Sequence, residues 1–392
     1  MEKTGRNVFL LATCQALFMT STAAVMTTSA LVGHMLADDK SLATLPLALQ
    51  FTSGMLSTIP ASLYMNRVGR RVGFITGTFI GMVGTAIAVH GIFANSLVLF
   101  CLGSFLIGSF NGFSRFFRFA AAEAASLEFR AKAISLVLAG GVVAAFTGPN
   151  LARITIEWFA PVVFAGTFVA LIGVQLAIVA VLLFIDIPMP DAAERGQNAR
   201  PLAEIVRQPV FVVAILGATV GYVVMSFLMT ITPLAMAGHH FNFSDSAFVI
   251  QSHILGMFLP AFFTGHLITR FGLLNVMLWG AAMLAGCILI NLSGTSFAHF
   301  AVSMALVGVG WNFLFVGATM LLTESCTAAE RAKTQAVNEF VVFGGVALGA
   351  LFSGVIQHSL GWFAVNLAVA PLVLVVTVAI IWLQLLRRRA AA

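Results

Sequence analysis

The amino-acid sequence predicts an all-α membrane protein whose twelve transmembrane helices form two six-helix bundles related by an internal parallel repeat. Three observations lead to this fold class: the apolar composition, the number of long apolar segments, and the recurrence of short motifs about 200 positions apart. Of the 392 residues, 60% are apolar and only 9% are charged. A soluble domain carries about 25% charged residues because its surface faces water, so most of this protein's surface must face lipid.

Twelve apolar segments are long enough to cross a bilayer, since about 20 residues of helix span a hydrocarbon core of roughly 30 Å. They are residues 8–35, 43–65, 72–92, 97–121, 132–157, 161–185, 210–236, 246–269, 274–292, 297–322, 335–357 and 362–386. The first segment is longer than the apolar core of about 7–15 residues in a cleavable signal peptide, so it counts as a span.

Basic residues mark one set of alternate loops, and the opposite loops hold little beyond Lys40 and Arg153. The set comprises Lys3, Arg6, Arg67, Arg70, Arg71, Arg130, Lys132, Arg195, Arg200, Arg207, Arg270, Arg331, Lys333 and Arg387 to Arg389. The positive-inside rule predicts that both termini and the central loop are cytoplasmic, in a multi-pass protein of the bacterial inner membrane. The net charge of +6 therefore orients the chain in lipid and indicates no nucleic-acid partner.

The segment from Asp186 to Gln208 is the only long polar stretch, and its prolines, acids and glycine are typical of a linker. It predicts an N-terminal six-helix bundle over residues 1–186, a cytoplasmic linker over 187–208, and a C-terminal six-helix bundle over 209–392.

The two halves repeat in sequence. The matching pairs are Glu123…Arg130-x-Lys132 with Glu324…Arg331-x-Lys333, Asn111 with Asn312, Arg67-x-Gly69 with Arg270-x-Gly272, and Gly140-Gly141-Val142 with Gly344-Gly345-Val346. Their displacements are 201, 201, 203 and 204 positions. Four matches in the same order indicate an internal duplication, which gives two parallel repeats of six spans.

The loop after the second span resembles the major facilitator signature G-x-x-x-D-R-x-G-R-K/R, and Gly265 to Gly272 is a degenerate second copy. The resemblance covers essentially the whole chain and implies a secondary transporter with a cytoplasmic gate loop. In this sequence the loop residues are Asn66, Arg67, Gly69, Arg70, Arg71, Arg270 and Gly272. Asn66 replaces an aspartate that helps to lock the cytoplasmic side in the family, and an amide accepts a weaker hydrogen bond than a carboxylate. The Gly148-Pro149 element resembles one in drug/proton antiporters.

Polar residues within the fourth span indicate where a solute binds. Asn111, Arg115 and Arg118 have the spacing i, i+4 and i+7, which places them on one helical face. Arg115 lies about 12 Å before Glu123 along the helix, at a depth where an arginine costs at least ~2.5 kcal/mol. We expect Arg115 to bind an anionic or carbonyl-rich group of the substrate. The alternative is that both arginines snorkel to the headgroups or pair with Glu123.

Further substrate-binding candidates lie on three other spans. Trp311 is in the middle of its span, beside Asn312, rather than in an interfacial belt where tryptophan is common. It is expected to wall a cavity and stack on a planar solute, with ordinary packing as the alternative. Gln15 and Tyr222 are polar candidates for the same cavity.

Proton coupling requires a titratable group that alternates between dry and wet surroundings. Glu339 is the only acid well inside a predicted span, and burial disfavours its charged form. The alternative for Glu339 is a salt bridge to Lys333 or Arg331 at the cytoplasmic mouth. His253 is the second candidate for proton coupling, and the histidines show no spacing typical of a metal site.

These features predict a monomeric secondary active transporter that moves a small organic solute by alternating access, coupled to protons and without a cofactor. An uncoupled facilitator of the same fold and a membrane sensor are the alternatives. The sequence contains no Walker A, G-x-S-x-G or H-E-x-x-H motif, so neither ATP-driven pumping nor those hydrolytic enzyme classes are indicated.

Overall fold

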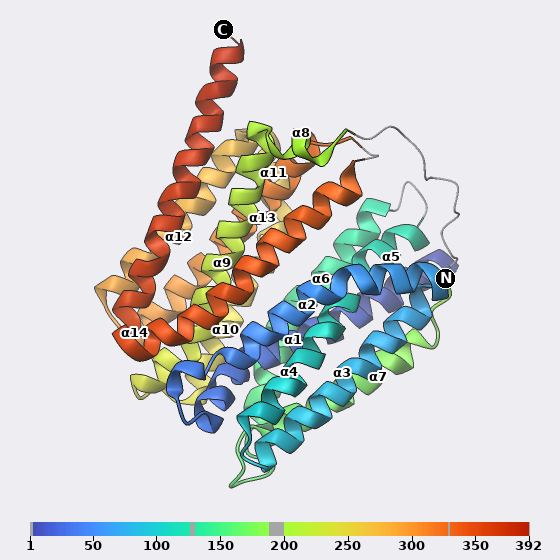
Figure 1. The fold of residues 1–392 in the computed structure, drawn as a ribbon, viewed down its shortest axis with the longest axis vertical. Helices are drawn as coiled ribbons and strands as arrows, with labels where there is room; N and C mark the ends of the chain where they lie inside the picture. Colours follow the sequence, from blue (N-terminus) through green and yellow to red (C-terminus); the bar gives the residue numbers. More distant parts are fainter. Residues whose placement is uncertain (1–2, 126–129, 188–199, 328–329, 392) are drawn as a thin grey trace.

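A computed structural model describes residues 3–125, 130–187, 200–327 and 330–391, and within these ranges the chain is built of helices without strands (Figure 1). The helices are α1 (Lys3–Leu36), η1 (Lys40–Leu42), α2 (Leu45–Val68), α3 (Arg70–Phe93), α4 (Leu97–Ser114), α5 (Phe117–Ala124), α6 (Arg130–Thr155), α7 (Ala165–Leu182), α8 (Leu202–Val206), α9 (Pro209–Gly238), α10 (Phe243–Phe258), α11 (Ala261–Phe271), α12 (Leu273–Ser293), α13 (Phe297–Glu324) and α14 (Arg331–Ala391).

Among the described residues, nine helices are long and apolar enough to cross a membrane, and the bent pair α10–α11 makes ten. α14 is one of the nine, but its 61 residues would extend about 90 Å, roughly three bilayer cores. It is divided at Gly361, whose φ of 76° is not helical. α6, which is outside that count, covers the predicted span 132–157 except for its last two residues. The predicted twelve spans are therefore consistent with the structure.

The membrane-facing character of the chain is visible on its outer surface. Large apolar side chains are exposed there, including Val98, Phe184, Leu289 and Leu360. Exposed apolar side chains in such number are unfavourable in water and favourable in contact with lipid. The protein is a multi-pass membrane protein.

Two predicted spans are interrupted. The predicted span 97–121 becomes α4 and α5, separated by a tight turn in which the N–H of Phe116 donates to the carbonyl of Phe113 at 3.1 Å. The predicted span 246–269 becomes α10 and α11, which are bent by 44°. Pro260 explains the second break, because its ring has no N–H and clashes with a helical turn before it.

The same helix pairings occur in both halves. α3 packs on α4 as α12 packs on α13, α1 packs on α6 as α9 packs on α14, and α2 packs on α4 as α10 packs on α13. Figure 1 shows α1–α7 on one side of the molecule and α9–α14 on the other. The two sides meet along α2–α14, α6–α10 and α1–α9. The boundaries at residues 186 and 209 stay a prediction, since most of the proposed linker lies outside the described ranges.

The two copies of the Arg-x-Gly motif have the same backbone. Gly69, between α2 and α3, has φ 88° and ψ 159°, and Gly272, between α11 and α12, has φ 89° and ψ 147°. Each glycine N–H donates to the carbonyl four residues earlier, Met65 or Ile268, at 2.9 Å. Only glycine adopts such a positive φ without strain, so both copies end one helix and begin the next in the same way.

The molecule has two distinct ends. The linker end carries the α2–α3 and α11–α12 junctions, α8 and both chain termini (Figure 1), and the far end carries the α1–α2 connection and the bend of α14. At the far end the halves are in contact: Thr44 Oγ1 donates to the carbonyl of Leu351 at 3.3 Å, and the rings of Phe164 and Phe243 lie 5.8 Å apart.

Candidate functional site

A cavity of about 240 Å³, the central chamber, lies between the two halves. Its lining includes five methionines, five phenylalanines, Tyr222 and Trp311, contributed mainly by α1, α2, α9, α10 and α13. Methionine and aromatic side chains give an adaptable apolar surface for a large ring system. A few polar groups are set into this surface, which is the usual composition of a small-molecule site.

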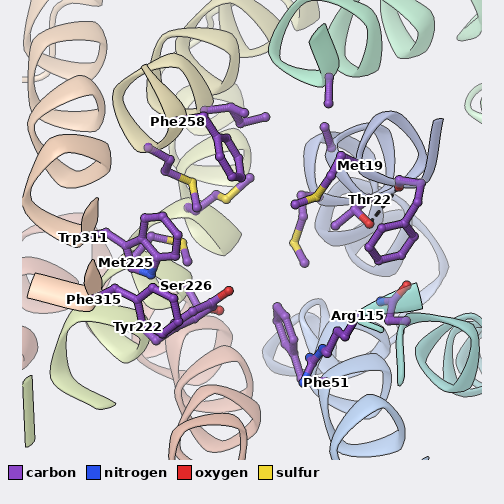
Figure 2. Close-up of a pocket in the computed structure, with 18 of the residues that line it drawn as sticks. Met19, Thr22, Phe51, Arg115, Tyr222, Met225, Ser226, Phe258, Trp311 and Phe315 are labelled. Carbon is purple, nitrogen blue, oxygen red and sulfur yellow. Dashed lines mark hydrogen bonds between the residues drawn. The ribbon is translucent and has the colours of Figure 1, made fainter. Parts of the chain in front are cut away.

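The C-terminal half provides an aromatic wall, formed by Tyr222, Trp311, Phe315 and Phe343. The Tyr222 ring meets the other three edge-on at centroid distances of 5.1 to 5.3 Å. Trp311 and Phe315 are stacked at 5.0 Å with an interplanar angle of 11°. Figure 2 shows Trp311, Phe315 and Tyr222 across the chamber from Met19, Phe51 and Arg115. Aromatic side chains of this kind make favourable stacked or edge-on contacts with a flat aromatic solute.

The N-terminal half provides most of the polar groups: Gln15, Thr22, Gln50, Asn111 and Arg115. The side-chain amide of Gln50 is buried, and neither its nitrogen nor its oxygen has a hydrogen-bond partner within the described protein. On the opposite side of the chamber, the hydroxyl of Ser226 and the indole N–H of Trp311 are also unpaired. Unpaired buried polar atoms are costly, so a ligand that reaches these groups gains hydrogen bonds.

Arg115 and Glu339 form an ion pair between the halves. Arg115 Nη1 lies 3.7 Å from Glu339 Oε2, and the side chains are 21% and 30% exposed. The guanidinium group also covers the Phe343 ring, with its central carbon 3.4 Å from the ring centroid. The candidate for substrate binding and the candidate for proton coupling are thus direct neighbours.

The predicted alternative partners of these two residues are engaged elsewhere or are not described. The Lys333 ammonium group donates to the carbonyl of Arg200, so it does not pair with Glu339. The side chains of Arg331 and Glu123 lie outside the described part of the chain.

A second cavity of about 350 Å³, the outer chamber, adjoins the first on the side of the linker end. Five residues line both chambers: Arg115, Arg118, Phe315, Glu339 and Phe343. The outer chamber adds hydroxyl and amide groups from Thr58, Ser62, Thr319, Thr323, Gln335 and Asn338. The Arg115–Glu339 pair therefore stands at the boundary between an aromatic chamber and a more polar one.

Arg118 is on α5, one turn beyond the break in the fourth span. Its guanidinium carbon lies 4.8 Å from the centroid of the Phe119 ring, and its buried Nε has no hydrogen-bond partner in the described ranges. With Asn111 and Arg115 it faces the chambers, so the i, i+4, i+7 face that the sequence predicts is brought together despite the break.

Two of the predicted substrate-binding and proton-coupling residues, Asn312 and His253, are not among those that line either chamber. Asn312 is buried between α10 and α13, where its amide donates to the carbonyl of Met257 at 2.7 Å and accepts from Thr264 Oγ1 at 2.6 Å. Met257 is in the last turn of α10, where carbonyls lack helical partners, so Asn312 stabilises the break at Pro260. His253 is fully buried on α10, with Nδ1 2.9 Å from the carbonyl of Met304.

The predicted gate-loop side chains lie at the linker end. Asn66, Arg67, Arg71 and Arg270 are at least partly exposed. Arg70 lies over the Phe116 ring at 5.5 Å, and Arg270 over the Phe271 ring at 5.2 Å.

Several lining residues are not predicted from the sequence. Gln50 carried a usable signal, because a glutamine inside an apolar span is costly unless it has a partner. Phe315, Phe343 and the five methionines carried none, since the chain has 36 phenylalanines and 16 methionines and nothing in the sequence separates lining residues from packing ones.

Comparison with known proteins gives a consistent set of relatives. A family model described as Major Facilitator Superfamily matches residues 9–260 and 252–392. The chain is 40% identical over 390 residues to the riboflavin transporter RfnT of Brucella anthropi, covering 99% of this chain and 98% of that protein. It is 29% identical to YdeG of Bacillus subtilis, an uncharacterized MFS-type transporter, over 96% of this chain and 91% of that one.

Solved structures with the same fold include two transporters. A point mutant of the nucleoside transporter NupG superposes with a TM-score of 0.71 at 13% identity, covering 95% of this chain and 99% of that chain. FucP, a Major Facilitator Superfamily transporter in the outward conformation, gives a TM-score of 0.62 at 15% identity, covering 96% of this chain and 98% of that chain. At such identities the likeness concerns the fold alone.

Proposed function

The chain belongs to the Major Facilitator Superfamily, and on this premise we propose that it carries riboflavin across the bacterial inner membrane by alternating access. The observation that supports this choice is the aromatic wall of Tyr222, Trp311, Phe315 and Phe343, which faces unpaired polar groups across a chamber of about 240 Å³. The relative in Brucella anthropi, named a riboflavin transporter, supports the same substrate.

Riboflavin suits both chambers by its chemistry. Its tricyclic ring is flat and aromatic, and such rings gain about 0.5–1.5 kcal/mol from stacked or edge-on aromatic contacts beyond the area they bury. Its carbonyl and N–H groups need partners, which the polar side of the central chamber offers. Its polyhydroxylated chain suits the outer chamber, where Thr58, Thr319 and Gln335 are among the lining residues.

Proton coupling is the second part of the proposal, and the Arg115–Glu339 pair supports it. An ionised Glu339 holds Arg115, and with it α4, against α14. When Glu339 binds a proton, the charge attraction is lost and Arg115 is free to contact the solute. The proton thereby changes the contact between the halves at the place where the solute passes. An uncoupled facilitator has no need of this carboxyl group.

The proposed orientation places the linker end, and with it both termini and the gate loop, in the cytoplasm, as the basic loops predict. In this orientation the outer chamber faces the cytoplasm and the closed far end faces the opposite side. That the transporter acts as a monomer stays a prediction.

Uptake of labelled riboflavin into proteoliposomes tests the proposal. We expect saturable uptake that accumulates above the outside concentration only when a pH gradient is imposed. Uptake that merely equilibrates under every gradient would identify a facilitator, and absence of uptake by folded protein would refute riboflavin as the substrate.

A further inference from the structure

Gln50 is the most unusual polar residue in the central chamber. It lies on α2, its side chain is 1% exposed, and both amide atoms lack partners among the described residues. The void on its other side is only about 10 Å³, which is room for one water molecule at most. Gln50 also lines the central chamber, so a ligand there can approach the amide from that side.

The backbone around Gln50 is held rigidly against α4. A side chain at Gly108 would collide with the Gln50 carbonyl group, so the two helices are in direct backbone contact there. One turn later, Ser53 Oγ lies 2.7 Å from Ser109 Oγ. An amide on such a support keeps its position without a bound partner, which is the arrangement of a pre-organised recognition group.

Gln50 begins a short polar row that faces the aromatic wall. A methyl group at Gly54, one turn after Gln50, would lie 3.6 Å from Arg115 Nη2 and 3.9 Å from Asn111 Cβ. Gln50, Asn111 and Arg115 thus lie close together on the N-terminal side of the chamber, and Figure 2 shows Arg115 across the chamber from Trp311 and Phe315. A ring that meets the aromatic wall edge-on spans the chamber and turns its opposite edge toward this row.

We propose that Gln50 recognises the substrate by a paired hydrogen bond to a ring edge that carries a carbonyl next to an N–H. The amide Nε2 donates to the ring carbonyl and Oε1 accepts from the ring N–H, so one carboxamide satisfies both atoms. The ligand class is a planar heterocycle with a lactam or imide edge. This inference rests on the proposed function, since the pyrimidine part of the flavin ring carries such an edge.

The test compares two ligands on two proteins. Riboflavin and 3-methylriboflavin differ at the ring N–H, which is methylated in the second. Binding to purified wild-type protein and to Gln50→Leu is measured by quenching of flavin fluorescence. We expect Gln50→Leu to raise the Kd for riboflavin about ten-fold or more, and to change the Kd for 3-methylriboflavin less than two-fold.

Two controls separate recognition from folding. Gln15→Leu removes a carboxamide from the same chamber and is expected to affect both ligands alike. The unliganded Gln50→Leu protein is expected to melt at the same or a higher temperature than wild type, because an unpaired buried amide has been replaced by an apolar group of similar size.

Three results would overturn the inference. Equal weakening of both ligands by Gln50→Leu would assign Gln50 to packing. Unchanged riboflavin affinity would show that Gln50 does not contact the ring. If folded wild-type protein binds no riboflavin, the proposed function fails and the inference fails with it, a result that is distinct from the first two because it appears without any substitution.

Discussion

Arg115 Nη1 lies 3.7 Å from Glu339 Oε2, and this ion pair connects the end of α4 in one half of the molecule to α14 in the other. It stands where the aromatic central chamber meets the polar outer chamber. Because the two residues belong to different halves, a motion that separates the halves at the linker end must break the pair. A solute that passes from one chamber to the other must pass it as well.

Replacing Glu339 with glutamine is expected to abolish riboflavin accumulation driven by a pH gradient, because the amide cannot exchange a proton. Riboflavin binding is expected to remain within about two- to five-fold of wild type, since hydrogen bonding at this position is retained. Proteoliposome uptake with and without the gradient, together with equilibrium binding, measures both effects. Glu324→Gln is the matched control, because Glu324 pairs with Arg387 at the exposed surface. Driven accumulation that survives in Glu339→Gln contradicts the coupling role.

Arg115→Lys is expected to transport poorly and Arg115→Ala not at all. The flat guanidinium group covers the Phe343 ring at 3.4 Å while facing Glu339, and a lysine supplies only a point charge. Arg115→Ala also leaves the Glu339 carboxylate without its partner. The loss of stability in the double variant Arg115→Ala/Glu339→Ala should therefore be smaller than the sum of the losses in the two single variants. Melting curves in detergent test this non-additivity, and strict additivity would show that the two residues do not interact.

The sequence predicts the membrane fold well because hydropathy and charge asymmetry act over whole segments. Glu339 and Arg115 stood out for a similar reason, since ionisable groups inside apolar spans are rare. The break at Pro260 and the aromatic wall are not predicted from the sequence, because they depend on which side of a helix faces which neighbouring helix. Asn111 and Asn312 show this limit: they match in the repeat, yet Asn111 lines the chamber and Asn312 supports the α10–α11 break.

Trp311→Leu is expected to weaken riboflavin binding by roughly 2- to 12-fold, which corresponds to the ~0.5–1.5 kcal/mol of an aromatic contact. Trp311→Phe should lose less, because the ring still stacks on Phe315. Isothermal titration gives the affinities. Trp158→Leu serves as the control, since Trp158 is exposed and away from the chambers. An equal effect of Trp158→Leu would place the cause outside the aromatic wall.

Asn312→Ala is expected to lower the stability of the protein by about 1–3 kcal/mol, because the Met257 carbonyl and the Thr264 hydroxyl lose a buried partner. Riboflavin affinity should change little, since Asn312 lines neither chamber. Thermal unfolding in detergent measures the loss. A variant with unchanged melting but lost binding would instead place Asn312 in the substrate site.

A pH-sensitive ion pair is expected to connect the C-terminal end of the central linker to the residue just before α14. Arg200 donates to Glu330 through Nε and Nη2, both at 2.7 Å, and Thr327 N–H donates at 2.9 Å. The Arg200 guanidinium and the Thr327 N–H hold the pKa of Glu330 well below its ordinary value.

A lowered folded-state pKa fixes the direction of the pH effect. The stability from this carboxylate is complete above the ordinary glutamate pKa of about 4.3 and is lost as the pH falls toward the lowered value. Melting temperatures at pH 7, 5 and 3.5 should therefore fall more for wild type than for Glu330→Gln. Glu157→Gln, at an exposed position, should show the same pH dependence of the melting temperature as wild type. Parallel curves for all three proteins would show that the Arg200–Glu330 pair does not contribute to stability.

On the proposed function, the Arg115–Glu339 pair at the boundary of the two chambers is expected to decide which flavin derivatives act as inhibitors. A flavin conjugate with a bulky tail places its ring on Trp311 and its tail between Arg115 and Glu339. The tail then keeps these two side chains apart and prevents the ion pair from forming again. A conjugate with a short tail is expected to be transported as a substrate, whereas one with a longer or branched tail is expected to act as a competitive inhibitor. In a series of flavin conjugates of increasing tail volume, the change from substrate to inhibitor should occur where the tail becomes larger than the space between Arg115 and Glu339.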